Sequence, residues 1–284
     1  MRWSRAYLSR MTWSPGSRER PRLGDLSGLA TASWGTEWGW PSPVVVDTTA
    51  STMAEIEECA RQGAPEGTVV VAEEQTSGRG RRGRTWESAP RAGLWWSLLL
   101  RPDAPPHDTG WLPLVVGVGV ARALRDHAGV EAGLKWPNDV LISNPDGRSA
   151  PVKIAGVLAE RLPDLSVVVG VGINVDHDVD ELPPGAGSLR TLGLAMDRTH
   201  LLMATLTSVA DAYQAWRRGD DMRPDYEHMS VTLGREVTVD LGSRTIAGRA
   251  VALGASGELI VQTAVGVQEV VSAGDVTTLR PAPG

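Results

Sequence analysis

Apolar residues recur along the chain with two different periods, which predict alternating strands and helices. Short β-branched runs predict strands at 44–46, 68–72, 94–100, 133–136, 140–143, 153–160 and 166–171, and apolar spacings of three and four predict helices at 113–126 and 199–218. Ser51 is suited to cap a further helix that stops at Gly63, in which Ile56 and Cys59 are expected to face the core. The pattern indicates an α+β domain.

The two ends of the chain differ from this domain in composition and in the spacing of their apolar residues. Residues 1–42 carry six arginines and five of the 11 tryptophans without a steady apolar period, which predicts a frayed N-terminal extension with a short helix after Pro21. After His228, glycine-containing turns separate short strands at 236–240, 245–253, 259–262, 267–271 and 276–279, as in a small β-barrel. The expected domains are therefore the extension at 1–42, the α+β domain at 43–228 and the barrel at 229–284.

Composition narrows the class of protein. Of the 284 residues, 42% are hydrophobic and 22% charged, which is typical of a packed globular protein. The net charge of -6 gives no general attraction to nucleic acid or anionic lipid. The apolar run 111–121 is far shorter than the ~20 residues that span a bilayer. With one cysteine, Cys59, and no secretory segment after Met1, we expect a cytoplasmic protein without an intramolecular disulfide.

An arginine-rich loop at 78–91 contrasts with the acidic chain around it. It has five arginines against one acid, Glu87, and it contains G-x-G-x-x-G and a near match to the P-loop pattern. Both patterns require a helix to follow, and the segment that ends in Pro90 and Arg91 lacks a helical period, so we interpret both matches as coincidental. We expect a loop that is mobile until an anion orders it. A solvated surface loop and an RNA-contacting tract are the other interpretations, although Trp86 is its one aromatic residue.

Three later segments carry further candidate chemistry: Lys135-Trp136-Pro137-Asn138-Asp139, Lys153-Ile154-Ala155-Gly156 and Gly170-Val171-Gly172-Ile173-Asn174. Lys135 could neutralise a phosphate while Asp139 binds Mg²⁺, but Asn-Asp after proline is also ordinary turn chemistry. Lys153 begins a strand, a position at which lysines commonly face solvent. Gly170 and Gly172 either kink their strand or let a ligand approach the backbone closely.

Together with Gln75 and the arginine loop, these segments occur in the order found in biotin protein ligases, which the chain resembles from 47 to 174. The barrel is similar to the C-terminal domain of that family. The resemblance implies a mixed β-sheet with flanking helices, like class II synthetases, followed by an SH3-like barrel. It also implies a ligase that uses ATP and Mg²⁺ to convert biotin to biotinyl-AMP. The biotin is then transferred to a lysine of a biotin carboxyl carrier protein, by a monomer or a homodimer and with no DNA or membrane partner.

The resemblance also implies roles for single residues. Those expected to bind biotin are Ser51, Thr52, Met53, Gln75, Arg79, Gly80, Arg81, Lys153, Gly156 and Gly170, and those expected to bind the nucleotide are Arg82, Arg84, Trp86, Lys135, Asn138 and Asn174. Lys153, Lys135, Asp139 and Arg81 are expected to be catalytic, with Asp139 also holding Mg²⁺ or accepting a proton from the acceptor lysine.

The chain departs from the family pattern in two places. Met53 replaces the asparagine of the family's Ser-Thr-Asn, and we expect its side chain to pack against a neighbouring strand or the apolar part of the ligand. Residues 1–42 are too short for the DNA-binding domain of the bifunctional members, so a repressor role is not expected. Their deletion is expected to leave biotin transfer largely intact, because every motif lies beyond Val44.

Overall fold

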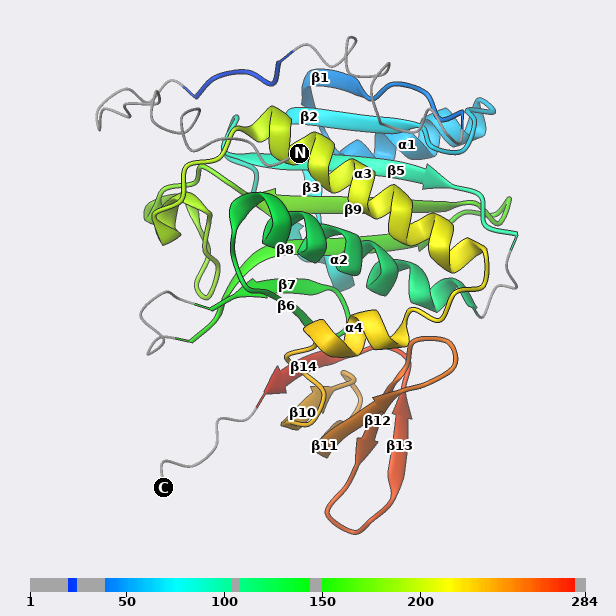
Figure 1. Ribbon diagram of the computed structural model, residues 1–284. Coiled ribbons are helices and arrows are strands. Elements are labelled where there is room, and N and C mark those ends of the chain that lie inside the picture. Colours follow the sequence, from blue (N-terminus) through cyan, green and yellow to red (C-terminus); the bar gives the residue numbers. More distant parts are fainter. Residues whose placement is uncertain (1–19, 25–38, 104–107, 144–149, 279–284) are drawn as a thin grey trace.

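A mixed seven-stranded sheet forms the middle layer of the molecule (Figure 1). The computed structural model describes residues 20–24, 39–103, 108–143 and 150–278. The strand order is β1 (Val44–Thr49), β2 (Val69–Gln75), β5 (Gly93–Leu100), β9 (Val167–Asn174), β8 (Val152–Arg161), β7 (Asp139–Ile142) and β6 (Ala132–Lys135). The pair β1–β2 is parallel and the other pairs are antiparallel. Every strand predicted for this domain is confirmed.

Helices cover both faces of this sheet (Figure 1). On one face, α2 (Leu112–Ala123) packs against α3 (Arg198–Arg217), and a Cβ at Gly119 would come within 2.6 Å of Val209, so the two helices require glycine there. On the other face, α1 (Thr52–Arg61) packs over β5 and β9. No helix in the described ranges is long and apolar enough to cross a membrane.

The helix α1 begins after Ser51 as predicted, but the Ser51 side chain makes no cap hydrogen bond, and the buried face of the helix differs from the prediction. Ile56 and Ala60 are buried, whereas Cys59 is only half-buried. Residues four apart on a helix lie on one face, so Ile56 and Ala60 point together toward the sheet. The assignment of Cys59 to the core is therefore wrong.

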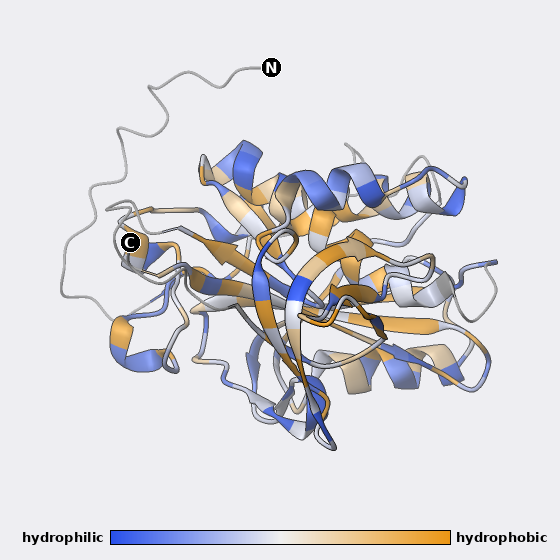
Figure 2. Ribbon diagram, turned by 90° about the horizontal axis from the view of Figure 1, so that it is seen from below, coloured by the Kyte–Doolittle hydropathy of each residue, from blue (hydrophilic) through white to orange (hydrophobic). Residues whose placement is uncertain are grey.

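Alternation along β5 divides its side chains between two environments. Leu94, Trp96 and Leu98 belong to the large core under α2 and α3. Leu99 packs instead with residues of α1, and Trp95 and Ser97 share its face of the sheet. In Figure 2 the strands at the centre are largely hydrophobic, while hydrophilic residues gather on the helices and loops around them. The open part of the α1 face, beside Trp95, is where a ligand can reach the sheet.

The C-terminal region is a separate antiparallel sheet, consistent with the expected barrel. Its strand order is β13 (Gln268–Val271), β12 (Leu259–Gln262), β11 (Thr245–Leu253), β10 (Glu236–Asp240) and β14 (Asp275–Thr278). The preceding helix α4 (Arg223–Met229) was not predicted, because seven residues with a proline in the first turn give no clear period. Two indoles join the domains: Trp136 donates to the carbonyl of Gly257 and Trp111 to that of Ala255.

The described part of the N-terminal extension is packed against the main domain. We call residues 20–24 the N-terminal strap. The carbonyl of Pro21 accepts a hydrogen bond from Arg198, the backbone N–H of Leu23 donates to Glu73, and that of Gly24 donates to Thr199. The expectation of a frayed tail is therefore wrong for these residues. Most of the helix expected after Pro21 lies outside the described residues, and residues 21–24 contain no helix.

Candidate active site

One row of directly paired residues crosses five strands on the α1 face of the sheet. Lys135 pairs with Asp139, Asp139 with Gly156, Gly156 with Gly172, and Gly172 with Trp95. Because directly opposed residues share a face, the row places a cation, a carboxylate, two glycines and an indole in line. The sequence segments that carried the candidate chemistry therefore meet in space.

A cavity of about 210 Å³ opens on this face. Fourteen of the predicted site residues line it: Ser51, Thr52, Met53, Gln75, Arg79, Gly80, Arg81, Arg84, Trp86, Asn138, Lys153, Gly156, Gly170 and Asn174. Three predicted residues, Lys135, Asp139 and Arg82, are not among its lining residues. Lys135 and Asp139 lie in the row beside it, whereas Arg82 points toward the C-terminal sheet.

A β-bulge directs Lys153 to the cavity. Val140 pairs with Ala155 but the next residue, Leu141, pairs with Lys153, so β8 has an extra residue at Ile154. The extra residue reverses the alternation and returns Lys153 to the face of Gly156. The Nζ of Lys153 lies 2.5 Å from Oδ1 of Asp139 and 5.3 Å from the centroid of the Trp86 ring. Lys153 is thus a cation of the site and not a solvent-facing strand end.

The glycines of β8 and β9 form a flat floor. A Cβ at Gly172 would come within 2.6 Å of the Trp86 ring, and one at Gly156 within 2.9 Å. The indole of Trp86 lies across both positions, and its Nε1 is buried without a hydrogen-bond partner among the described residues. These glycines let the indole of Trp86 lie against the backbone of both strands, and the approach of a ligand to them stays a prediction.

Hydroxyl and amide groups converge at the end of the cavity next to α1. The backbone N–H and Oγ1 of Thr52 donate to Oε1 of Gln75 at 2.8 and 3.1 Å, and Thr52 Oγ1 lies 2.8 Å from Ser97 Oγ. Ser51 Oγ is buried with no partner in the described ranges. Met53 packs on Gly170, where a Cβ would meet its side chain at 2.8 Å, so its expected packing against a neighbouring strand is observed. Ser97 was not predicted, because one serine in an apolar strand gives no motif.

The arginine loop forms a small hairpin over the cavity. Its strands are β3 (Gly78–Arg79) and β4 (Thr85–Trp86), and no helix follows, which confirms that both phosphate-loop matches are coincidental. Arg81 donates to Oδ1 of Asn138 and to the carbonyl of Gly274, both at 3.3 Å. Burial lowers the pKa of its guanidinium. The mobility of the loop in the free protein stays a prediction.

Acidic residues on three other elements contact three further arginines of the loop. Arg79 lies 2.6 Å from a carboxylate oxygen of Glu57 on α1 and 3.7 Å from one of Glu160 on β8. Arg84 lies 2.9 Å and Arg82 3.5 Å from the carboxylate of Asp275 on the C-terminal sheet. The loop is therefore held in part by the other domain, and its charge is largely compensated within the molecule.

A second wall of the cavity, which we call the His177 wall, was not predicted. It is formed by His177, Glu181, Leu182 and Pro183, in the loop that follows β9. His177 is 1% exposed and lies edge-on to Trp95, with ring centroids 6.1 Å apart. Burial lowers the pKa of His177 to about 4, so the imidazole is neutral at pH 7, and its Nδ1 has no partner within the described structure. Its one sequence signal is its position directly after the glycine-rich end of β9.

The donors for a metal ion are sparse. Asp139 is the expected Mg²⁺ ligand, and the described residues contain no group of three or more His, Cys, Asp or Glu side chains suited to a metal. Mg²⁺ characteristically keeps several waters and binds through one or two carboxylates together with phosphate oxygens. One carboxylate beside a cationic cavity therefore fits an ion that a bound nucleotide brings with it.

Comparison with known proteins places the chain in a family. Residues 45–178 match the model of the biotin/lipoate A/B protein ligase family, and residues 232–277 match the biotin protein ligase C-terminal domain. The chain is 38% identical over 271 residues to a biotin--[acetyl-CoA-carboxylase] ligase of Mycobacterium tuberculosis, covering 93% of this chain and 98% of that protein. The chain belongs to the biotin protein ligase family.

Other members of the family match the chain over most of its length. The biotin protein ligase of Aquifex aeolicus, solved with biotin and ATP, superposes with a TM-score of 0.71 at 30% identity and covers 84% of this chain and 99% of its own. The bifunctional ligase/repressor of Bacillus subtilis is 31% identical over 238 residues, which are 80% of this chain and 71% of that protein. The expected fold of a ligase domain followed by a small β domain is confirmed, and the RNA-binding interpretation gains no support.

Proposed function

We propose that this biotin protein ligase activates biotin with ATP and transfers it to a lysine of a biotin carboxyl carrier domain. The assignment of the reaction rests on the family and on relatives named for acetyl-CoA carboxylase. The observation that carries it in the structure is the row from Lys135 to Trp95, with Lys153 returned to its face by the bulge. This row carries the Trp86 indole over its two glycines and holds cations in fixed places, and the two substrates present a ring and anionic groups to match them.

The first step joins two anions. The biotin carboxylate attacks the α-phosphorus of ATP, the bond to the β-phosphate oxygen breaks, and biotinyl-AMP and pyrophosphate form. Catalysis must therefore come mainly from positioning and from neutralising charge. Lys153 lies on the cavity floor between the hydroxyl cluster and Asp139, where it can neutralise the carboxylate and the α-phosphate. Mg²⁺, when bound, would further neutralise the phosphates.

The two ends of the cavity suit different parts of the adenylate. We assign biotin to the end next to α1, where Ser51, Thr52 and Gln75 present hydroxyl and amide groups and Met53 an apolar surface. We assign the nucleotide to Trp86, whose indole lies over Gly156 and Gly172, and to the cations beyond it. The residues for the nucleotide side are Trp86, Arg81, Arg84, Asn138, Lys135 and Asn174, while Arg79 and Gly80 border the biotin. Arg82 contacts the C-terminal sheet, and its role there is to anchor the loop.

In the second step the acceptor amine attacks the acyl carbon of biotinyl-AMP and AMP leaves. The mixed anhydride is prone to hydrolysis, so the arginine loop would protect it by excluding water. The lysine amine must also lose a proton. Asp139, the carboxylate of the row, is the candidate base, and Lys153 already pairs with it. Binding of Mg²⁺ and acceptance of a proton would compete for this one carboxylate.

A single assay tests this function. Biotin-dependent exchange of labelled pyrophosphate into ATP, in the presence of Mg²⁺, measures the first step alone. We expect exchange that requires biotin, followed by labelling of a carboxyl carrier domain. Salt-sensitive RNA binding without exchange would reject the assignment in favour of an RNA-binding module.

The substitution Lys153→Ala tests the site itself. In Lys153→Ala the cavity still removes water from the biotin carboxylate but no longer supplies the compensating cation. Breaking such a charge pair costs about 2 to 5 kcal/mol, equivalent to a ~30-fold or larger loss of exchange. Arg161→Ala removes a cation from the exposed end of the same strand and serves as the control. Exchange by Lys153→Ala within threefold of the unmodified protein would remove Lys153 from the catalytic residues.

A further inference from the structure

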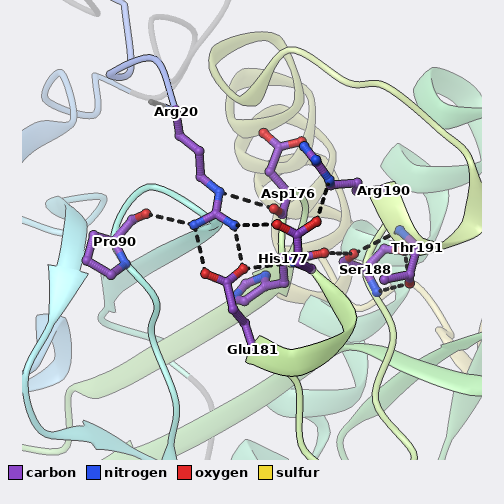
Figure 3. Close-up of polar contacts among 9 residues, drawn as sticks. Arg20, Pro90, Asp176, His177, Glu181, Ser188, Arg190 and Thr191 are labelled. Atoms are coloured by element: carbon purple, nitrogen blue, oxygen red, sulfur yellow. Dashed lines mark hydrogen bonds and ion pairs between the residues drawn. The ribbon is translucent and has the colours of Figure 1, made fainter. Parts of the chain in front are cut away.

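The cavity wall formed by His177 and Glu181 is fastened by a residue more than 150 positions earlier in the chain. Arg20 of the N-terminal strap donates from Nε to the carbonyl of Asp176 at 3.1 Å and binds both carboxylate oxygens of Glu181 through its two terminal nitrogens. It also reaches the carbonyl of Pro90 at 3.4 Å. Figure 3 shows these contacts converging on one guanidinium. Arg20 thus joins the loop after β9 to the segment before β5.

The strap is itself anchored to a buried ion pair. Arg198 and Glu73 lie 2.8 Å apart, and their side chains are 3% and 5% exposed. Glu73 accepts from the backbone N–H of Leu23 at 2.5 Å, and Arg198 donates to the carbonyl of Pro21 at 2.6 Å. The backbone on both sides of Arg22 is therefore bound to the domain core. The side chain of Arg22, in contrast, is 61% exposed and pairs with an exposed Asp47.

The fastened loop determines where His177 lies. Asp176 and Glu181 flank His177, and the carbonyl of His177 accepts from Ser188 Oγ at 2.7 Å. The charged groups around its imidazole are Arg20, Asp178 and Glu181, and Arg190 binds Asp178 from the same side. Held in this way, the neutral imidazole meets the edge of Trp95 and borders the cavity.

We propose that Arg20 of the N-terminal strap is a positioning residue of the active site, which holds His177 and Glu181 as the wall of the biotin end of the cavity. The proposal rests on the proposed function for the identity of the ligand. His177 contacts Trp95 of β5, the strand that also carries Ser97 of the hydroxyl cluster, and not the strands of Lys135 and Asp139. The wall therefore acts on biotin more than on ATP.

Steady-state exchange kinetics of three variants test this assignment. Arg20→Ala removes the guanidinium that binds both carboxylate oxygens of Glu181. Arg20→Lys keeps the positive charge but cannot bind both oxygens in this forked geometry. Arg22→Ala is the matched control on the same strap. We expect Arg20→Ala to raise the KM for biotin about tenfold or more, as loss of charged hydrogen bonds predicts, with the KM for ATP within threefold. Arg20→Lys should recover only part of the loss, because an ammonium cannot bind the carboxylate in the forked geometry. Arg22→Ala should match the unmodified protein.

Titration of His177 by NMR gives a readout that does not depend on activity. Glu181→Ala deletes a negative charge next to the imidazole, which alone would lower the pKa of His177 below about 4. Release of the loop would instead expose the ring and raise its pKa toward 6.5. The proposal requires this rise. Deleting the positive charge of Arg20 would raise the pKa even with the loop in place, so the second test uses Arg20→Lys, which keeps the charge and should still show part of the rise, whereas Arg22→Ala should show none.

The outcomes separate the proposal from the function on which it rests. If the unmodified protein shows no biotin-dependent exchange, the proposed function fails, and the titration still decides whether Arg20 holds the wall. If exchange is normal and Arg20→Ala behaves like Arg22→Ala in both KM values, the strap has no part in the active site. A fall in the pKa of His177 in Glu181→Ala would also overturn the proposal, because the loop would then have kept its place.

Discussion

The two walls of the cavity are held by different kinds of interaction. The arginine loop is fixed to the C-terminal sheet by pairs such as Arg84–Asp275, whose side chains are 62% and 38% exposed. Such exposed pairs contribute about 0 to 1 kcal/mol. The His177 wall depends on Arg20, which is 18% exposed, and on the buried pair Arg198–Glu73 behind it. From this contrast we expect the arginine loop to move more readily than the His177 wall, so that ligands enter past the loop.

The largest effect expected from this contrast is on stability. Glu73→Gln breaks the buried pair under the strap and leaves the Arg198 guanidinium without its counter-charge, which costs about 3 to 5 kcal/mol. Urea unfolding at pH 7 measures the change. Asp275→Asn provides the matched carboxylate-to-amide control in the other wall. Equal losses for the two variants would mean that both walls are held equally firmly.

The fixed wall also predicts a dependence of stability on pH. Because burial lowers the pKa of His177 from 6.5 to about 4, the unfolded chain binds more protons than the folded chain between these values. Stability from the neutral imidazole is therefore full above pH 6.5 and falls as the pH drops toward 4, by about 3 kcal/mol in total. The measurement is the difference in unfolding free energy between the unmodified protein and His177→Gln at pH 7 and at pH 4. A difference that does not change with pH would show that this imidazole is not buried in solution.

Met53 lines the cavity through a third kind of interaction, because its side chain packs on Gly170 by apolar contact alone. A neutral hydrogen bond contributes about 0.5 to 1.5 kcal/mol, so Met53→Asn should change the Kd for biotin by no more than about tenfold in either direction. Calorimetric titration of biotin into both proteins measures this. A gain of a hundredfold would mean that the methionine weakens the site, and the assignment of biotin to this end would then need revision.

The smallest effect on stability is expected in the arginine loop. Asp275→Asn should change the free energy of unfolding by less than about 1 kcal/mol, because the pairs it breaks are exposed. It should nevertheless speed trypsin cleavage within 78–91, and biotin with ATP should protect the loop in both proteins. Cleavage that is slow without ligands, and no faster in Asp275→Asn, would show that the arginine loop is as firmly held as the His177 wall.

Local pattern predicted most of the fold, and the family resemblance predicted one side of the site. Strands such as β10, β11 and β12 have the predicted bounds, because alternation and glycine turns are properties of neighbouring residues. The residues of the motifs were placed together through the resemblance, and fourteen of them line one cavity. Ser97, His177 and Glu181 could not be found in this way, since their place depends on which strands pair and which loops meet. Arg20 is the clearest case, because the contacts that give it importance lie about 70 and 156 positions away.

The bulge at Ile154 makes the site depend on strand register in a way that side-chain chemistry does not reveal. In a regular strand the faces alternate with every residue, so Lys153 and Gly156, three positions apart, would lie on opposite faces. The bulge leaves Ile154 without a partner on β7 and places both residues on the face of the cavity. Deleting Ile154 would keep Leu141 opposite Lys153 in a regular ladder, and the lysine would keep its face. Pairing Leu141 with Ile154 would instead direct the amine of Lys153 into the hydrocarbon interior below the sheet. A relative that has this lysine can therefore share the chemistry with the bulge or with one residue fewer, but not with a regular strand of the same length.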